Sequence, residues 1–331
     1  MSAEFMGPGG WLGSVDGERR AFGEMGNSMP EVVCRHVAKR TLNDQLLEQT
    51  KLLQDENGID DGFSFLHFSE AIFGNELPWK KQLIGSCVAS GDMRTTSYRM
   101  LAEVFLLGDP EILPGIDIEG TDAFAPFAPF SYRAGRKRGN LNGRSDGSYC
   151  SVHMQGKIED GILFCNSGVQ SDTYPEPQNT SLYRKWGGDD NLYNQWKDKA
   201  GEIKQIETEE VRTFDDVKEL LTVHYKPMNI CSSWGFAPSH KHPTWRLDNG
   251  DPVWVYKRSG SWAHNMSLVA CVEIKNEWFV VVENSWGSTH KNGRWFVVTE
   301  STMNSWLRSA SCLSVGEIDL KDQLPIFTGA N

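Results

Sequence analysis

The chemistry suggested by this sequence begins at Cys87, which could act as a nucleophile. Cys87 follows Gly85 and Ser86 and precedes a segment whose apolar residues recur at helical spacing. A cysteine at a helix N-terminus lies among unpaired backbone N–H groups at the positive end of the helix dipole. Both favour the thiolate, which is the nucleophilic form. The backbone N–H of Cys87 could also bind the oxyanion that forms when a carbonyl group is attacked.

A histidine and an asparagine could supply the partners that such a nucleophile needs. His264 opens an apolar strand over 266–272, and Asn284 ends the next strand within Glu283-Asn284-Ser285-Trp286-Gly287. Two adjacent antiparallel strands would bring His264 and Asn284 side by side. An amide oxygen on one imidazole nitrogen fixes the tautomer and leaves the other nitrogen for the cysteine. Trp286 is expected to shield that hydrogen bond from water.

Taken together and in this order, the motifs resemble the papain family of cysteine peptidases. The resemblance is carried by Gly85-Ser86-Cys87 at a helix start, the distant His264, and Asn284-Ser285-Trp286-Gly287. Glu283 before the asparagine and Gly293 after it are particularly similar to the bleomycin-hydrolase branch. The resemblance covers roughly residues 78–315. It implies hydrolysis of peptide or amide bonds through a Cys-His-Asn site and a thioester intermediate, without a cofactor or a metal.

The residues around the nucleophile depart from the family pattern. The family signature has a second cysteine before the nucleophile and an aromatic residue after it, where this sequence has Ile84 and Val88. The family's oxyanion-hole glutamine lies one residue further upstream than Gln82 lies from Cys87. The resemblance therefore predicts Gln82 as a second oxyanion donor, provided that a one-residue deletion is absorbed in the loop.

The elements that must position these residues divide the sequence into a helical part and a β part. Helices are expected over 31–56, Cys87 to Leu107, Ser148 to Glu159 and Phe214 to His224. Strands are expected over Lys226 to Trp234, Val253 to Tyr256, Leu268 to Ile274, Trp278 to Glu283 and Arg294 to Thr299. This order predicts an α+β fold. The resemblance makes it a papain-like, two-lobed fold with substrate bound in the cleft between a helical lobe and an antiparallel β lobe.

The predicted domain organisation has three parts. Residues 1–77 form an N-terminal extension, interpreted as a pro-segment or a docking arm; residues 78–319 form the peptidase domain; residues 320–331 form a C-terminal tail. His264 lies 177 residues after Cys87, compared with about 130–150 in the family. The additional length is expected in residues 110–147 and 166–200, which are interpreted as loops.

The composition limits the partners and the location of the protein. A net charge of −11 argues against broad nucleic-acid or anionic-membrane binding. The sequence has no apolar run of about 18 residues that could span a membrane, and residues 1–29 lack the pattern of a secretion signal. Its seven cysteines are widely spaced without a Cys-x-x-Cys pair, which argues against a zinc site or a dense disulfide framework. We expect an intracellular, reducing compartment or a particle assembled there.

The sequence also fits functions other than peptide hydrolysis. The expected partner is a peptide or protein substrate, but the diverged nucleophile signature also fits a silent, structural papain-fold component of a larger assembly, such as a viral particle. Such an assembly could dock through residues 1–77 or through the Phe-Pro stretch Phe124–Phe130. The rings of that stretch could equally pack on the underside of a long loop. Other Cys-His acyl transfer, by an amidase or a transpeptidase, is a second alternative. The basic run Arg133–Arg138 is interpreted as a solvated loop.

Overall fold

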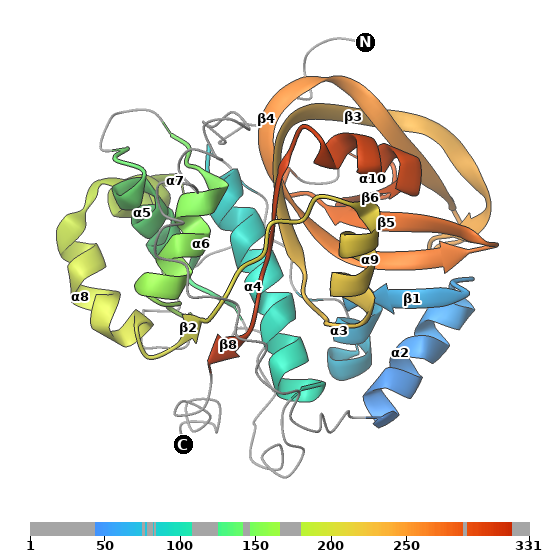
Figure 1. Cartoon of the computed structure of the whole chain (residues 1–331), viewed down its shortest axis with the longest axis horizontal. Helices are drawn as coiled ribbons and strands as arrows, with labels where there is room; N and C mark the ends of the chain where they lie inside the picture. The colour runs from blue at the N-terminus through green and yellow to red at the C-terminus, as the bar shows by residue number, and fades with distance from the viewer. Residues whose placement is uncertain are drawn as a thin grey trace.

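The computed structural model describes residues 44–74, 77, 82, 84–107, 125–141, 146–165, 180–286 and 290–319. Residues 1–43 of the predicted extension, the predicted tail over 320–331, Phe124 and Gly287 lie outside this range. Figure 1 shows a helical lobe on one side and a β lobe on the other, with α4 (Cys87–Phe105) running between them. The α+β fold predicted from the sequence is confirmed.

The helical lobe consists of α4 and four shorter helices. These are α5 (Ala128–Arg138), α6 (Cys150–Glu159), α7 (Thr180–Gly188) and α8 (Asp190–Ala200). Phe127 and Phe130 are buried in the core of this lobe, where both rings pack on Trp186 and Phe130 stacks on Tyr193. The predicted docking patch over Phe124–Phe130 is therefore wrong for these two rings, because they hold the lobe's own helices together.

The β lobe is built around one large sheet. Its strand order is β5-β6-β4-β3-β7, and β1 pairs in addition with β4. The strands are β1 (Asp61–Ser64), β3 (Met228–Arg246), β4 (Pro252–Ile274), β5 (Glu277–Glu283), β6 (Trp295–Thr299) and β7 (Ser311–Ser314). All neighbours pair antiparallel, except for one parallel contact between β4 and β6. The helices α2 (Asp44–Glu56), α3 (Phe65–Phe73), α9 (Phe214–Thr222) and α10 (Glu300–Leu307) belong to this side, and β2 (Lys204–Gln205) pairs with β8 (Ile318–Asp319).

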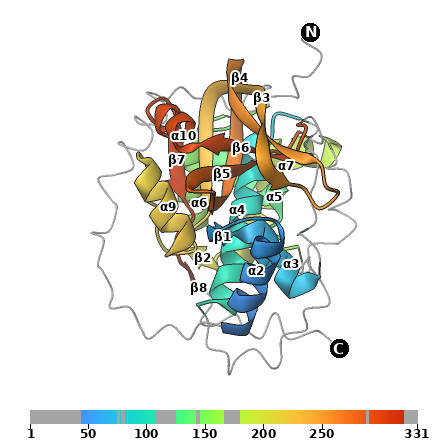
Figure 2. The same ribbon diagram turned by 90° about the vertical axis from the view of Figure 1, so that its right-hand side faces the viewer.

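Part of the predicted N-terminal extension packs into the β lobe. Strand β1 pairs with β4 from Asp61 opposite Glu273 to Ser64 opposite Ala270. Phe63, Phe65 and Phe68 lie in the main hydrophobic core of the molecule. Figure 2 shows β1 with α2 and α3 at one end of the sheet. Residues 61–68 are thus part of the same folded body as the residues after position 78.

Helix α4 is buried along its whole length. Of its residues only Glu103 is not buried, which is the pattern of a core helix rather than of an amphipathic surface helix. Its interior charges are paired: Asp92 with Lys157 of α6 at 2.6 Å, and Arg94 with Glu283 of β5 at 2.9 Å. Buried charges are tolerated when they are paired in this way, so α4 is tied by ion pairs to both lobes.

The long β3–β4 hairpin joins segments that the sequence pattern separates. Strand β4 spans 23 residues and merges two predicted strands, because the polar stretch between them still pairs with β3. Four register shifts interrupt this pairing. Among the described helices, none combines the length and the apolar character that a membrane crossing requires.

Candidate active site

Cys87 is the first residue of α4 and is completely buried. It follows a tight turn in which the Ser86 N–H donates to the Ile84 carbonyl at 2.7 Å. Its neighbours in a small apolar cluster include Val88, Cys150 and Cys231. Cys87 is not part of a disulfide. Cys87 therefore lies at the start of a helix, as the sequence predicts.

His264 and Asn284 meet as the sequence predicts. Strand β4 pairs with β5 as far as Ser267 opposite Glu283. His264 lies three residues before Ser267 and Asn284 directly follows Glu283, so the two side chains lie close together beyond the last pair. The His264 Nε2 lies 2.8 Å from the Asn284 Oδ1, and the Trp286 N–H donates to the same oxygen at 3.2 Å. Because that backbone N–H needs an acceptor, the oxygen of the Asn284 amide faces His264. The His264 Nε2 therefore carries a proton and donates it.

The other ring nitrogen of His264 is the one available for acid–base chemistry. Within the described part of the chain, the buried Nδ1 has no hydrogen-bond partner. Burial lowers the pKa of His264 to about 3; the Asn284 hydrogen bond raises this pKa and the nearby His290 lowers it. A neutral ring with its proton on Nε2 has a lone pair on Nδ1. This tautomer can accept a proton from a thiol.

Trp286 covers the histidine. Its ring stacks on the His264 ring with 3.9 Å between centroids and is itself buried. Trp262 packs edge-on against Trp286. The predicted shielding of the His264–Asn284 hydrogen bond by Trp286 fits this arrangement.

Asn265, which the sequence analysis did not single out, ties the histidine strand to the nucleophile helix. Its amide Nδ2 lies 3.4 Å from the Cys87 carbonyl oxygen and 3.2 Å from the Val88 carbonyl oxygen. Its Nδ2 also lies 3.0 Å from the Asn229 Oδ1. The residue directly after His264 is therefore bonded to the first turn of α4. This contact brings the β4 backbone next to Cys87.

Gln82 lies beside both the nucleophile turn and the asparagine motif. Its backbone N–H donates to the Ser285 carbonyl at 2.8 Å, and its side-chain Oε1 accepts from the Ser285 hydroxyl at 2.7 Å. Its Nε2 donates to the Ile84 carbonyl at 2.7 Å. These bonds link the segment before Cys87 to the segment after Asn284. The role of Gln82 as an oxyanion donor stays a prediction.

A disulfide, which the sequence analysis did not predict, joins the two lobes near the site. Cys150 at the start of α6 is bonded to Cys231 of β3, across 81 residues of sequence. The wide spacing of the cysteines argued against a dense disulfide framework. It could not reveal this single pair, because spacing in the sequence does not show which cysteines lie close together in the fold. Both cysteines share an apolar cluster with Cys87.

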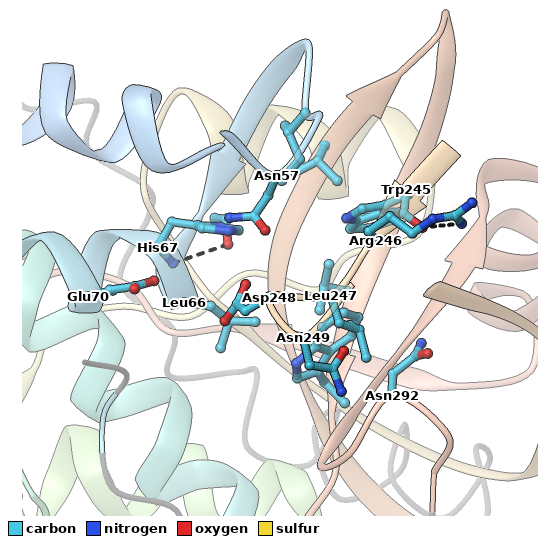
Figure 3. Close-up of a pocket in the computed structure, with 15 residues that line it drawn as sticks. Asn57, Leu66, His67, Glu70, Trp245, Arg246, Leu247, Asp248, Asn249 and Asn292 are labelled. Atoms are coloured by element: carbon cyan, nitrogen blue, oxygen red, sulfur yellow. Dashed lines mark hydrogen bonds between the residues drawn. The ribbon is translucent and has the colours of Figure 1, made fainter. Parts of the chain in front are cut away.

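A cavity among the described residues lies away from the candidate catalytic residues. Figure 3 shows Asn57, His67 and Glu70 from the N-terminal segments facing Trp245 and the turn that follows β3. This cavity of about 280 Å³ contains none of the candidate catalytic residues in its lining. No group of three or more metal-binding side chains occurs in the described part of the chain.

Comparisons with known proteins give structural likeness only. No protein-family model matches the sequence, and no curated protein matches it. The structure is similar to that of xylellain, a cysteine protease from Xylella fastidiosa, with 13% identity and a TM-score of 0.49, covering 87% of this chain and 94% of that one. It is similar to procathepsin B S9 from Trypanosoma congolense, with 12% identity and a TM-score of 0.47, covering 81% and 80%. The proform of the ragweed pollen cysteine protease Amb a 11 is similar at 12% identity and a TM-score of 0.43, covering 86% and 67%.

Proposed function

We propose that this chain is a papain-like cysteine peptidase that hydrolyses peptide or amide bonds. The observation that carries the proposal is the 2.8 Å contact between the His264 Nε2 and the Asn284 Oδ1. It fixes the tautomer in which Nδ1 is the basic nitrogen. Asn265 holds the same strand against the helix turn that begins with Cys87. Together with the start of a helix at Cys87, these contacts support a Cys-His-Asn site.

The proposed reaction follows from these positions. The Nδ1 of His264 accepts the thiol proton as the Cys87 sulfur attacks the substrate carbonyl carbon. The backbone N–H of Cys87, with Gln82 as second donor, binds the oxyanion. His264 then gives its proton to the leaving amine, and a thioester remains on Cys87. Water, deprotonated by His264, attacks the thioester and releases the acid.

The test is labelling by an epoxide probe for cysteine peptidases, read by mass spectrometry of peptides from the intact, folded chain. We expect a label on Cys87 in the wild type, no label at that position in Cys87→Ala, and a labelling rate reduced roughly 100-fold or more in His264→Ala. Cys165→Ala removes another buried cysteine outside the disulfide and His224→Ala removes a surface histidine. Both should label like the wild type.

One observation favours the second candidate, a silent structural member of this fold class. The side chains of Cys87 and His264 are both completely buried, whereas a working peptidase must admit a substrate to them. A wild type in which Cys87 is no more reactive than Cys165 would support the structural role. Labelling at Cys87 that depends on His264 would reject it. Thioester transfer to an amine other than water, as in a transpeptidase, would be recognised from the product masses.

A further inference from the structure

A second histidine lies on the far side of Asn284 from His264. The Asn284 Nδ2 is 2.7 Å from the Nε2 of His290. The distance between these atoms is that of a good hydrogen bond. Because the Asn284 amide nitrogen carries only hydrogens, the Nε2 of His290 must be the acceptor. His290 is therefore neutral in this arrangement, with its own proton on Nδ1.

The loop that carries His290 is fastened to the strand that carries His264. Asn292 exchanges two hydrogen bonds with the backbone of Trp254 in β4, both at 2.8 Å. The Lys291 N–H donates to the Tyr256 hydroxyl at 2.7 Å. The ring of His290 packs edge-on against Tyr256 and lies 4.7 Å from the Phe296 ring. The position of His290 is thus set by β4 and β6.

The orientation of the Asn284 amide decides which nitrogen of His264 is basic. In the observed orientation the oxygen accepts from the His264 Nε2, and the lone pair of His264 lies on Nδ1. If the amide turned over, its NH₂ group would face His264, and Nε2 would become the acceptor. The proton of His264 would then move to Nδ1, where it would prevent that nitrogen from accepting the thiol proton.

We propose that His290 is a positioning residue that holds the Asn284 amide in the orientation that makes the Nδ1 of His264 the base. This inference rests on the proposed function, because it concerns the tautomer of the proposed general base. The acceptor on His290 matches the NH₂ group of Asn284, and the Trp286 N–H matches its oxygen. The opposite orientation would leave the Trp286 N–H without this acceptor and would require His290 to move its proton from Nδ1 to Nε2. The observed contacts accordingly run from His264 through Asn284 to His290.

The test compares two substitutions of His290. His290→Leu removes the acceptor at similar volume, and His290→Gln keeps an acceptor oxygen within reach. We expect the rate of epoxide labelling at Cys87 to fall roughly 10- to 100-fold in His290→Leu, as for other displaced catalytic groups. His290→Gln should stay within about three-fold of the wild type. His224→Leu, a surface histidine paired with Glu219, should not change the rate.

A second readout separates positioning from a general effect on the fold. The ¹⁵N chemical shifts of the His264 ring report which nitrogen carries the proton. We expect Nδ1 to be unprotonated in the wild type and in His290→Gln, and partly protonated in His290→Leu. His290→Phe serves as the acceptor-free variant should His290→Leu fail to fold.

Different results would overturn the proposed function and the role of His290. An unlabelled wild type overturns the proposed function, yet the ¹⁵N shifts still decide the role of His290. An acceptor-free variant with the wild-type labelling rate and the wild-type His264 tautomer would overturn the role of His290 while leaving the proposed function intact.

Discussion

The residues around His264 set its pKa and its tautomer. Burial lowers the pKa of this ring to about 3 and that of His290 to about 4. Both rings are therefore neutral at ordinary pH, and each can offer one lone pair. Asn284 lies between them: its oxygen accepts a hydrogen bond from His264, and its NH₂ group donates one to His290. The resting site is built around a neutral base.

Close packing at Gly91 keeps the histidine strand next to the nucleophile helix. A Cβ atom at position 91 would lie 2.5 Å from the Asn265 Nδ2, the atom that also contacts the Cys87 and Val88 carbonyl oxygens. Alanine is ordinarily the better helix former, by up to about 1 kcal/mol. Here the clash should outweigh that gain.

We predict that Gly91→Ala lowers the free energy of unfolding by about 1–3 kcal/mol and slows the epoxide labelling of Cys87. Urea unfolding and the labelling rate are the measurements. The matched control is Gly156→Ala in α6, where the nearest atom to an added Cβ is 3.4 Å away. That variant should be as stable as the wild type or more so. Equal behaviour of the two variants would show that the Asn265 contact does not position the site.

The sequence predicts those site residues that lie next to a recognisable helix or strand pattern. Cys87 precedes a helical pattern, and His264 and Asn284 flank apolar strands, so their types and places could be interpreted together. His290 and Asn265 have no such signal. Their roles depend on a loop fastened by Asn292 and on a contact between β4 and α4, both of which arise only when distant segments pack.

A cluster of ion pairs links α4, which begins with the nucleophile, to β5, which ends before the asparagine. Glu283, next to Asn284, accepts from the Arg94 Nε and a terminal guanidinium nitrogen of Arg94 at 3.1 and 2.9 Å, and Arg294 lies 3.2 Å away. Burial alone would raise the pKa of Glu283, but Arg94 and Arg294 outweigh burial and hold this pKa below its usual value. The carboxylate is therefore charged and fixes the end of β5 to the middle of α4.

Removing the charge of Glu283 should destabilise the folded protein. Glu283→Gln keeps the shape of the side chain but leaves the buried Arg94 guanidinium and the partly buried Arg294 guanidinium without their counter-charge. We expect the free energy of unfolding to fall by about 3–5 kcal/mol. Chemical denaturation measures the effect. Glu202→Gln, in the partly exposed pair with Lys199, is the control and should cost less than about 1 kcal/mol. A similarly small cost at Glu283 would contradict the structural role of the cluster.

At the level of elements, sequence patterns predicted the helices and strands with clear apolar periods and missed helices α5, α7 and α8. Helix α4 begins at the predicted residue. Helix α5 was interpreted as a solvated loop because of its arginines, yet Arg133 and Arg136 are buried and donate to the Gly187 and Gly147 carbonyls. The sequence cannot show carbonyl partners that come from other segments. Helix α8 did carry a signal, since Asp189 caps its start and lysines occupy its last turn.

An ion pair, hydrogen bonds and a disulfide join the two lobes of the molecule near the candidate site. The Arg94–Glu283 pair, the Asn265 contacts with α4 and the Cys150–Cys231 disulfide all join a segment of the helical lobe to a strand of the β lobe. Cys87 shares an apolar cluster with the two disulfide cysteines. The relative position of the nucleophile and the histidine is accordingly determined by covalent, ionic and hydrogen-bonded contacts between the lobes.

Hydrolysis of a defined peptide library by the full chain, with the products identified by mass, would show directly whether the protein is a peptidase. We predict new N- and C-terminal fragments with the wild type and with Cys165→Ala. Neither Cys87→Ala nor His264→Ala should yield them. A library left as intact by the wild type as by Cys87→Ala would show that the chain is not a peptidase of this kind. Cleavage that survives the loss of Cys87 would show that Cys87 is not its nucleophile.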